Sequence, residues 1–249
     1  MLSTSKNEIL KDLKDFENRG YKERLLKLYR RLPKMECKGC GVCCYDSPVT
    51  SYAEFLFAFD YFNDDNNFSY EDRLKIYKKA FKENIIGLIS KEVSCAFLSE
   101  DNRCLIHERA PLSCKLWGTK TEEEYVRDLD KDHDRNKDYK EHLAKLGVNM
   151  PDEVVNYKTP NCDNVKIISN PYKLSNREFD SIILNDILKV NFPYRKKNAP
   201  DWTIGCYLLY YIFGDVILKE RINIVRDYQS GNVNAVEEFI NKIDFSKYI

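Results

Sequence analysis

The sequence predicts a mainly α-helical protein with a small β-hairpin and with cysteine-rich loops around a metal site. Three observations support this fold class. Apolar residues recur at helical intervals along most of the 249-residue chain. One stretch, 93–107, instead holds two short apolar runs on either side of a turn-like segment, which is typical of a hairpin. The run from Glu36 to Asp46 holds four closely spaced cysteines.

The composition indicates a folded protein and argues against a nucleic-acid-binding or membrane protein. A hydrophobic content of 43% is sufficient for a packed core. Basic and acidic residues both number 40, so the chain has no excess charge for nucleic acid or anionic membranes. The most apolar window, Gly205 to Leu218, is too short to span a bilayer. The first residues lack the apolar run of a secretory signal, so we expect reduced thiols in a cytoplasmic protein that binds neither nucleic acid nor membrane.

The first half of the chain shows four helical patterns. Residues 6–32 form two helices that separate near Gly20. Ser51 and Glu54 form a capping-box pattern ahead of a helix at about 52–62. The apolar stripe of a fourth helix extends over 70–89.

The last third of the chain is also helical. We expect one helix over 176–190, a long apolar helix from an Asp201 cap through 202–224, and a final helix over 233–243. These patterns divide the chain into an N-terminal helical arm (1–34), a cysteine-cluster metal-binding domain (35–165) and a C-terminal helical region (166–249).

The Glu36–Asp46 run has the spacing of a metal site. Its cysteines are three residues apart, with one more directly behind, and a C-x2-C step lets two thiolates reach one metal. Gly39 and Gly41 lie inside the steps, where we expect positive φ angles. Because adjacent side chains diverge, we expect Cys44 to face a second centre or to donate a hydrogen bond, rather than to share the ion of Cys43.

Four more cysteines lie beside turns or on the predicted hairpin, where Cys95 and Cys104 are expected on opposite arms. They are Cys95, Cys104, Cys114 and Cys162. The ninth cysteine, Cys206, falls inside an apolar helix and is predicted to be a small buried hydrophobe.

The charged stretch 121–141 allows two interpretations. From Asp130 to Glu141, its carboxylates follow the order of ligands in a calcium-binding loop. However, Arg135 occupies the place where the sharp turn requires glycine. This favours a solvated charged loop over a calcium site.

The cysteine order resembles a known family. C-x2-C-x2-C-C, then Cys-Ala-Phe-Leu, then Cys-Leu-Ile-His-Glu-Arg-Ala-Pro-Leu-Ser-Cys-Lys is similar to the CxxCxxCC family, also called the YkgJ-type cysteine-cluster proteins, which is described as zinc- or iron-chelating. His107 stands where the family has tyrosine, and we favour a structural histidine there over a ligand. The resemblance implies metal ligands among eight cysteines: Cys37, Cys40, Cys43, Cys44, Cys95, Cys104, Cys114 and Cys162.

The metal is predicted from the first three cysteines, which reproduce the start of a ferredoxin-like C-x2-C-x2-C run. We therefore favour an iron–sulfur cluster over zinc. In this interpretation the cluster is structural or carries electrons, and the protein acts through a protein partner.

Two alternatives stay open. Flagellin lysine N-methylases contain a related domain, so the resemblance also allows an enzyme that uses S-adenosylmethionine on a protein substrate. Only 9 glycines and no G-x-G-x-x-G motif count against it. A structural zinc-binding interaction module is the other alternative. No catalytic residue or reaction follows from the sequence.

Overall fold

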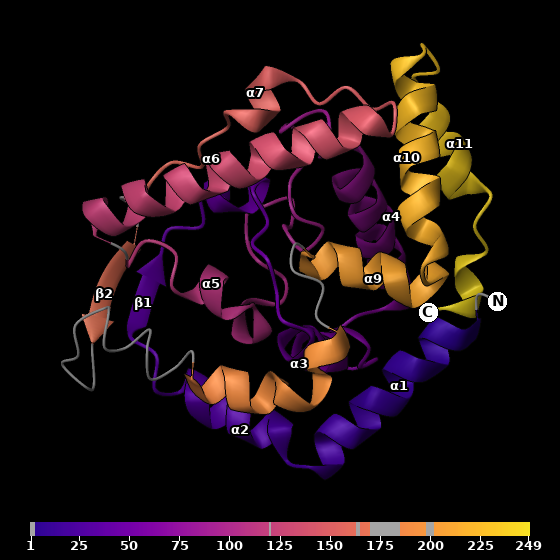
Figure 1. Ribbon diagram of the computed structural model, residues 1–249. Coiled ribbons are helices and arrows are strands. Elements are labelled where there is room, and N and C mark those ends of the chain that lie inside the picture. Colours follow the sequence, from indigo (N-terminus) through magenta and orange to yellow (C-terminus); the bar gives the residue numbers. More distant parts are fainter. Residues whose placement is uncertain (1–2, 120, 163–164, 170–184, 198–201) are drawn as a thin grey trace.

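The computed structural model describes residues 3–119, 121–162, 165–169, 185–197 and 202–249. Most of these residues lie in helices, which confirms the predicted fold class. In Figure 1, α1 (Ser3–Asn18) and α2 (Tyr21–Tyr29) lie along the lower edge, and α6 (Glu122–Lys145) crosses the upper edge. The two strands lie on the left, and α10 (Val216–Gln229) and α11 (Ala235–Asn241) lie on the right.

The two N-terminal helices are separated at Gly20 (φ 66°), as predicted. Helix α3 (Tyr52–Phe62) begins with the predicted capping box between Ser51 and Glu54, and nearly all of its side chains are buried. Helix α4 (Tyr70–Ile86) also begins with a capping box, formed by Ser69 and Asp72. The glycine at position 20 and the capping box at Ser51 therefore predicted the helix boundaries correctly.

The centre of the core is aromatic. Phe55 of α3 stacks on Tyr207 of α9 (Ile204–Phe213), with 5.0 Å between ring centroids, and Phe59 lies 4.8 Å from Tyr211. Helix α9 also contacts α1 and α4, so helices from both ends of the chain pack against the middle of it. The ends themselves meet where Lys6 Nζ donates to the carbonyl of Lys247 at 2.5 Å.

The predicted apolar helix over 202–224 is wrong, because the chain forms α9 and α10 there. Gly214 adopts φ 60° and ψ −151°, a conformation that only glycine adopts without strain, and this ends α9. The Thr203 side chain caps α9, whereas the predicted cap, Asp201, lies outside the described residues. The helix over 185–191 matches the described part of the predicted helix 176–190, and α11 confirms the final helix.

The extended segments differ from the predicted hairpin. Strand β1 (Lys34–Cys37) pairs antiparallel with β2 (Val165–Ser169), and neither strand was predicted. Within 93–107 the chain does reverse, but it forms only an isolated bridge between Leu98 and Cys104. Cys104 therefore lies opposite Leu98, and the prediction that it faces Cys95 across a hairpin is wrong.

The charged stretch 121–141 forms neither of the expected loops. It lies in helix α6, which Thr121 and Glu124 cap and which is followed by the short helix α7 (Asp152–Val155). Charged residues with good helix propensity fill this stretch, and no glycine or proline interrupts it. A continuous helix cannot wrap an ion as a calcium loop does, so the calcium interpretation is wrong as well.

None of the helices within the described ranges is long and apolar enough to cross a membrane.

Candidate metal centre

The cysteine run packs against the turn that precedes Cys104. Cys37 ends β1, and Cys43 and Cys44 lie in the 3-10 turn η1 (Val42–Tyr45). Both glycines of the run have the predicted positive φ angles, 65° at Gly39 and 72° at Gly41. A Cβ atom on Gly41 would lie 3.1 Å from the Asn102 side-chain oxygen. Glycine therefore allows the close approach that brings these segments together.

Two further segments are fixed to this run by hydrogen bonds. The Cys95 N–H donates to the carbonyl of Cys44 at 2.6 Å. The Asp46 carboxylate pairs with Lys91 Nζ at 2.8 Å and accepts a hydrogen bond from Thr159 Oγ1 at 2.8 Å. Because Thr159 is buried and precedes Cys162 by three residues, Asp46 holds the Cys162 segment beside the run.

Cys44 interacts with its neighbour Cys43, which agrees with the expectation that the Cys44 thiol donates a hydrogen bond. The 3-10 turn brings the two side chains within hydrogen-bonding reach of each other. The bond from the Cys44 thiol stabilises the Cys43 thiolate and lowers the pKa of Cys43, and it correspondingly raises the pKa of Cys44. The adjacent pair thus presents both sulfur atoms to one region.

Five thiols lie close enough together to affect one another's pKa values. Cys95 and Cys104 raise the pKa of Cys44, after the larger effects of the Cys43 bond and of burial. Burial raises the pKa of Cys114 most, and Cys95, Cys104 and Cys43 raise it further. Negative charge on one sulfur therefore disfavours charge on the next, and a metal cation would relieve that repulsion. We refer to Cys43, Cys44, Cys95, Cys104 and Cys114 as the thiol cluster.

Glu54 positions the fifth thiol. Its buried carboxylate caps α3 and accepts the backbone N–H of Leu112 at 2.7 Å. Leu112 begins the short helix α5 (Leu112–Lys115), which carries Cys114. Burial lowers the pKa of Lys115, whereas Cys104 and Cys114 raise it. A cationic lysine beside these sulfurs would favour their ionised forms.

The remaining cysteines lie at the edge of the thiol cluster or away from it. Cys37 and Cys40 are exposed, and Cys37 raises the pKa of Cys104 as one of the smaller influences after burial. A Cβ atom on Gly118 would lie 3.1 Å from the Cys162 Cβ. Cys206 Sγ donates to the Asn84 side-chain oxygen at 2.8 Å, within α9 and α4. Cys206 therefore has a structural partner outside the cluster, consistent with the prediction that it is not a ligand.

His107 lies in the 3-10 turn η2 (His107–Arg109), where burial lowers its pKa and Lys115 lowers it further.

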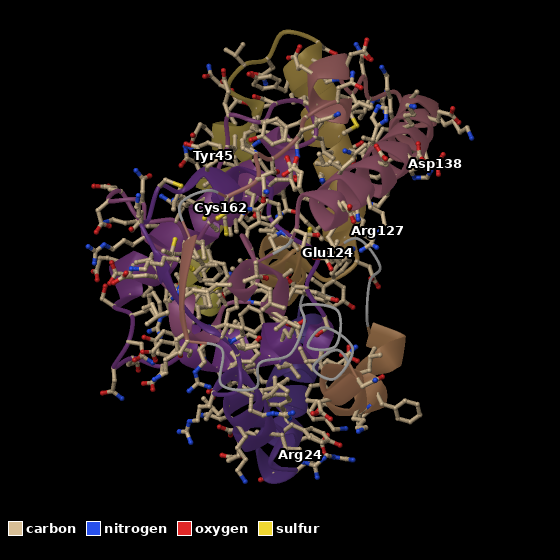
Figure 2. The ribbon with its side chains drawn as sticks, turned by 90° about the vertical axis from the view of Figure 1, so that its left-hand side faces the viewer. Arg24, Tyr45, Glu124, Arg127, Asp138 and Cys162 are labelled. Atoms are coloured by element: carbon tan, nitrogen blue, oxygen red, sulfur yellow. The ribbon has the colours of Figure 1, made fainter. Side chains whose placement is uncertain are left out.

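The thiol donors fit a zinc or iron ion by their chemistry. Thiolates are the ligands that both metals accept in all-cysteine sites. Part of the Cys114 residue is exposed to solvent, although its thiol lies among enough neighbouring atoms for burial to raise its pKa. None of the nine cysteines, all of which lie in the described residues, forms a disulfide. Within the described residues, no group of three or more His, Cys, Asp or Glu side chains is arranged so that it could hold a metal ion. Figure 2 shows sulfur atoms in yellow near the labelled Tyr45 and Cys162.

Three residues that support the site were not predicted from the sequence to do so. They are Asp46, Glu54 and Thr159. Asp46 directly follows the cysteine run, and Glu54 was identified only as a helix cap. A local signal existed for both residues, but their long-range partners could not be read from it.

Comparison with known proteins agrees with this site. Residues 36–142 match the family model CxxCxxCC, described as "Putative zinc- or iron-chelating domain". The matched stretch contains the thiol cluster with Cys37 and Cys40, and it ends before Cys162. No curated protein and no solved structure matches the chain. Residues 36–142 are therefore similar to the domain that this family model describes.

Proposed function

We propose that the protein holds an iron–sulfur cluster through the thiols of its CxxCxxCC domain. The observation that carries this proposal is that thiols from separate segments of the chain lie near enough to raise the pKa values of Cys44 and Cys114. The proposed ligands are drawn from the thiol cluster together with Cys37, Cys40 and Cys162.

Two features favour iron–sulfur over zinc. The overlapping C-x2-C steps resemble the first three ligands of a ferredoxin-like run, and the remaining ligand would come from a distant cysteine. More thiols are also present than a single tetrahedral zinc ion needs.

When bound, the cluster would supply either a redox centre or a rigid cross-link between segments. The chain's own residues would hold and orient it. Asp46 and Glu54 fix the backbone of the ligand segments through their hydrogen bonds, and Lys115 offsets negative charge at Cys104 and Cys114. We propose that such a protein acts through a protein partner.

Anaerobic purification tests the metal identity. We expect brown protein with broad charge-transfer absorption, and with iron and acid-labile sulfide in comparable amounts. Colourless protein with stoichiometric zinc, and without iron even after anaerobic reconstitution, would contradict the iron–sulfur proposal. That result would favour a structural zinc site, because Zn²⁺ has no redox chemistry of its own.

A further inference from the structure

Helix α4 holds the Cys95 segment at two points. Glu83 Oε2 accepts the N–H of Ala96 at 2.8 Å. One turn earlier on the same face of the helix, Lys79 Nζ donates to the carbonyl of Leu98. The backbone on the C-terminal side of Cys95 is therefore fixed to a helix that itself carries no cysteine.

The same segment provides a hydrogen bond to the Cys95 sulfur. This sulfur accepts the N–H of Phe97, and such a bond favours the thiolate form, which is the form that binds metals. Phe97 directly follows Ala96, so the backbone that Glu83 holds is the backbone that presents this N–H. On its other side, the Cys95 N–H is bonded to the carbonyl of Cys44.

Ser47 forms a second link between Glu83 and Cys95. Its hydroxyl lies close enough to hydrogen-bond with either side chain, and it lowers both pKa values, which burial, the largest influence, raises. Ser47 Oγ and Glu83 Oε1 are shielded from solvent and have no other hydrogen-bond partner within the described part of the chain. Because Ser47 follows Cys44 by three residues, this link also joins two segments that contribute to the thiol cluster.

The C-terminal helices enclose Glu83. Helix α9 packs against α4 (Figure 1), and a Cβ atom on Gly205, in the first turn of α9, would lie 3.0 Å from Glu83 Oε2. Glycine therefore lets α9 cover the carboxyl group closely. Burial of a carboxyl group is costly unless its oxygens are hydrogen-bonded, and an apolar side chain would fill the same space at a lower cost. The bonds of Glu83 to the Cys95 segment offset this cost.

We propose that Glu83 is a positioning residue of the metal centre, which holds the Cys95 sulfur beside the other four thiols through Ala96 and Ser47. This role rests on the proposed function, because it requires Cys95 to bind the metal. It extends the support of the centre from the cysteine segments to α4, and to the C-terminal helix that covers the carboxyl group.

The rate of metal loss to a chelator tests the proposal. Glu83→Leu removes both links and keeps the buried space filled, so it should release its metal at least about tenfold faster than the wild type, as expected when a residue that supports a ligand is lost. Glu83→Gln keeps an oxygen for Ala96 and a polar group for Ser47. It should restore most of the retention.

Ser47→Ala separates positioning from a general loss of stability. This variant keeps the bond to Ala96 and removes only the hydroxyl beside the Cys95 sulfur. We expect near-normal metal content but a shifted sulfur-to-metal charge-transfer absorption, because hydrogen bonds to sulfur tune a thiolate-bound metal. A zinc-containing protein is measured after substitution with cobalt(II), since Zn²⁺ itself gives no such absorption.

Asn84→Leu is the matched control. Asn84 is the next residue of α4 and is also buried, but it bonds to the Ala80 carbonyl and to Cys206 instead of to the thiol cluster. Like Glu83→Leu, this variant should be less stable in urea. Unlike Glu83→Leu, it should release metal at the wild-type rate and keep the wild-type spectrum.

Four results would overturn the proposal. They are wild-type metal release from Glu83→Leu, equally fast release from Glu83→Leu and Asn84→Leu, no recovery in Glu83→Gln, and an unchanged spectrum in Ser47→Ala. The last variant keeps the test decisive if Glu83→Leu does not fold. A wild type that holds zinc would contradict only the iron–sulfur proposal, because these comparisons apply to either metal, whereas a wild type that holds neither metal would overturn both proposals.

Discussion

Burial controls the protonation of the thiols at the candidate centre. Cys95 and Cys104 are partly buried, and burial is the largest of the effects that raise their pKa values above the ordinary value of 9.0. In the metal-free protein at neutral pH, both side chains are therefore protonated. A metal must displace these protons when it binds, so metal affinity should rise with pH.

The same pKa shifts predict the pH dependence of stability in the metal-free protein. A thiol with a raised pKa in the folded state stabilises the fold at pH values below its unfolded pKa. This contribution is lost as pH rises from about 9 toward the folded pKa, because only the unfolded chain then ionises. We expect the free energy of unfolding to fall by about 1.4 kcal/mol per pH unit for each such thiol above pH 9.

Urea unfolding of metal-free protein at pH 8 and pH 10 measures this effect. The double variant Cys95→Ser, Cys104→Ser is the control, and its stability should fall less over the same interval. A wild-type protein that is equally stable at both pH values, or more stable at pH 10, would contradict the raised pKa values of Cys95 and Cys104.

At the scale of secondary structure, a single carboxylate connects three elements. Glu54 caps α3, accepts the N–H of Leu112 at the start of α5, and accepts a hydrogen bond from Tyr29 of α2 at 3.4 Å. Because α5 has only four residues, it cannot be stable by itself. Its position, and that of Cys114, therefore depends on tertiary contacts of this kind.

Glu54→Ala should destabilise both the fold and the centre. We expect a loss of about 2–5 kcal/mol in unfolding free energy, from the missing cap and from an unpaired N–H at Leu112. Bound metal should decrease as well, because Cys114 is released from its position. Chemical unfolding and metal analysis of the purified variant measure the two effects.

Asp72→Ala is a matched control, because Asp72 forms the same capping box on α4 without contacting a cysteine segment. It should cost about 1 kcal/mol and leave the metal content unchanged. Equal metal loss in both variants, or full metal content in Glu54→Ala, would show that Glu54 does not position Cys114.

At the scale of the whole molecule, the chain combines a local cysteine motif with helices from both ends. Helix α9 packs against α1, α3 and α4, so a helix from the last fifth of the chain completes the core around α3 and α4. Helix α10 contributes Arg221 to a cavity of about 690 Å³, which Ser47 and Glu83 also line. The division at residues 34 and 165 stays a prediction.

The features that could be predicted from the sequence are those that short segments determine. The capping box at Ser51, the helix break at Gly20 and the positive φ angles of Gly39 and Gly41 each depend on a few neighbouring residues. Metal binding was predicted in the same way, from C-x2-C spacing.

The features that could not be predicted depend on distant partners or on competing local signals. Strand β1 pairs with β2, which lies more than 120 residues further along the chain, and the bond between Asp46 and Thr159 joins the same two regions. Apolar periodicity continues across Gly214, so only the backbone conformation of that glycine reveals the break. The cavity joins Ser47, Glu83 and Arg221, which no spacing rule connects.

The central claim is that thiols converging from distant segments hold a metal. The most direct test compares the metal content of Cys104→Ser and Cys206→Ser, purified anaerobically beside the wild-type protein. Cys104 belongs to the thiol cluster, whereas Cys206 bonds to Asn84 outside it, and serine can preserve that bond. We expect Cys104→Ser to lose most of its metal, with at least a roughly tenfold loss of affinity, since even residues that only support ligands contribute 10–100-fold. Cys206→Ser should match the wild type. Full metal content in Cys104→Ser, or metal loss in Cys206→Ser alone, would contradict this account.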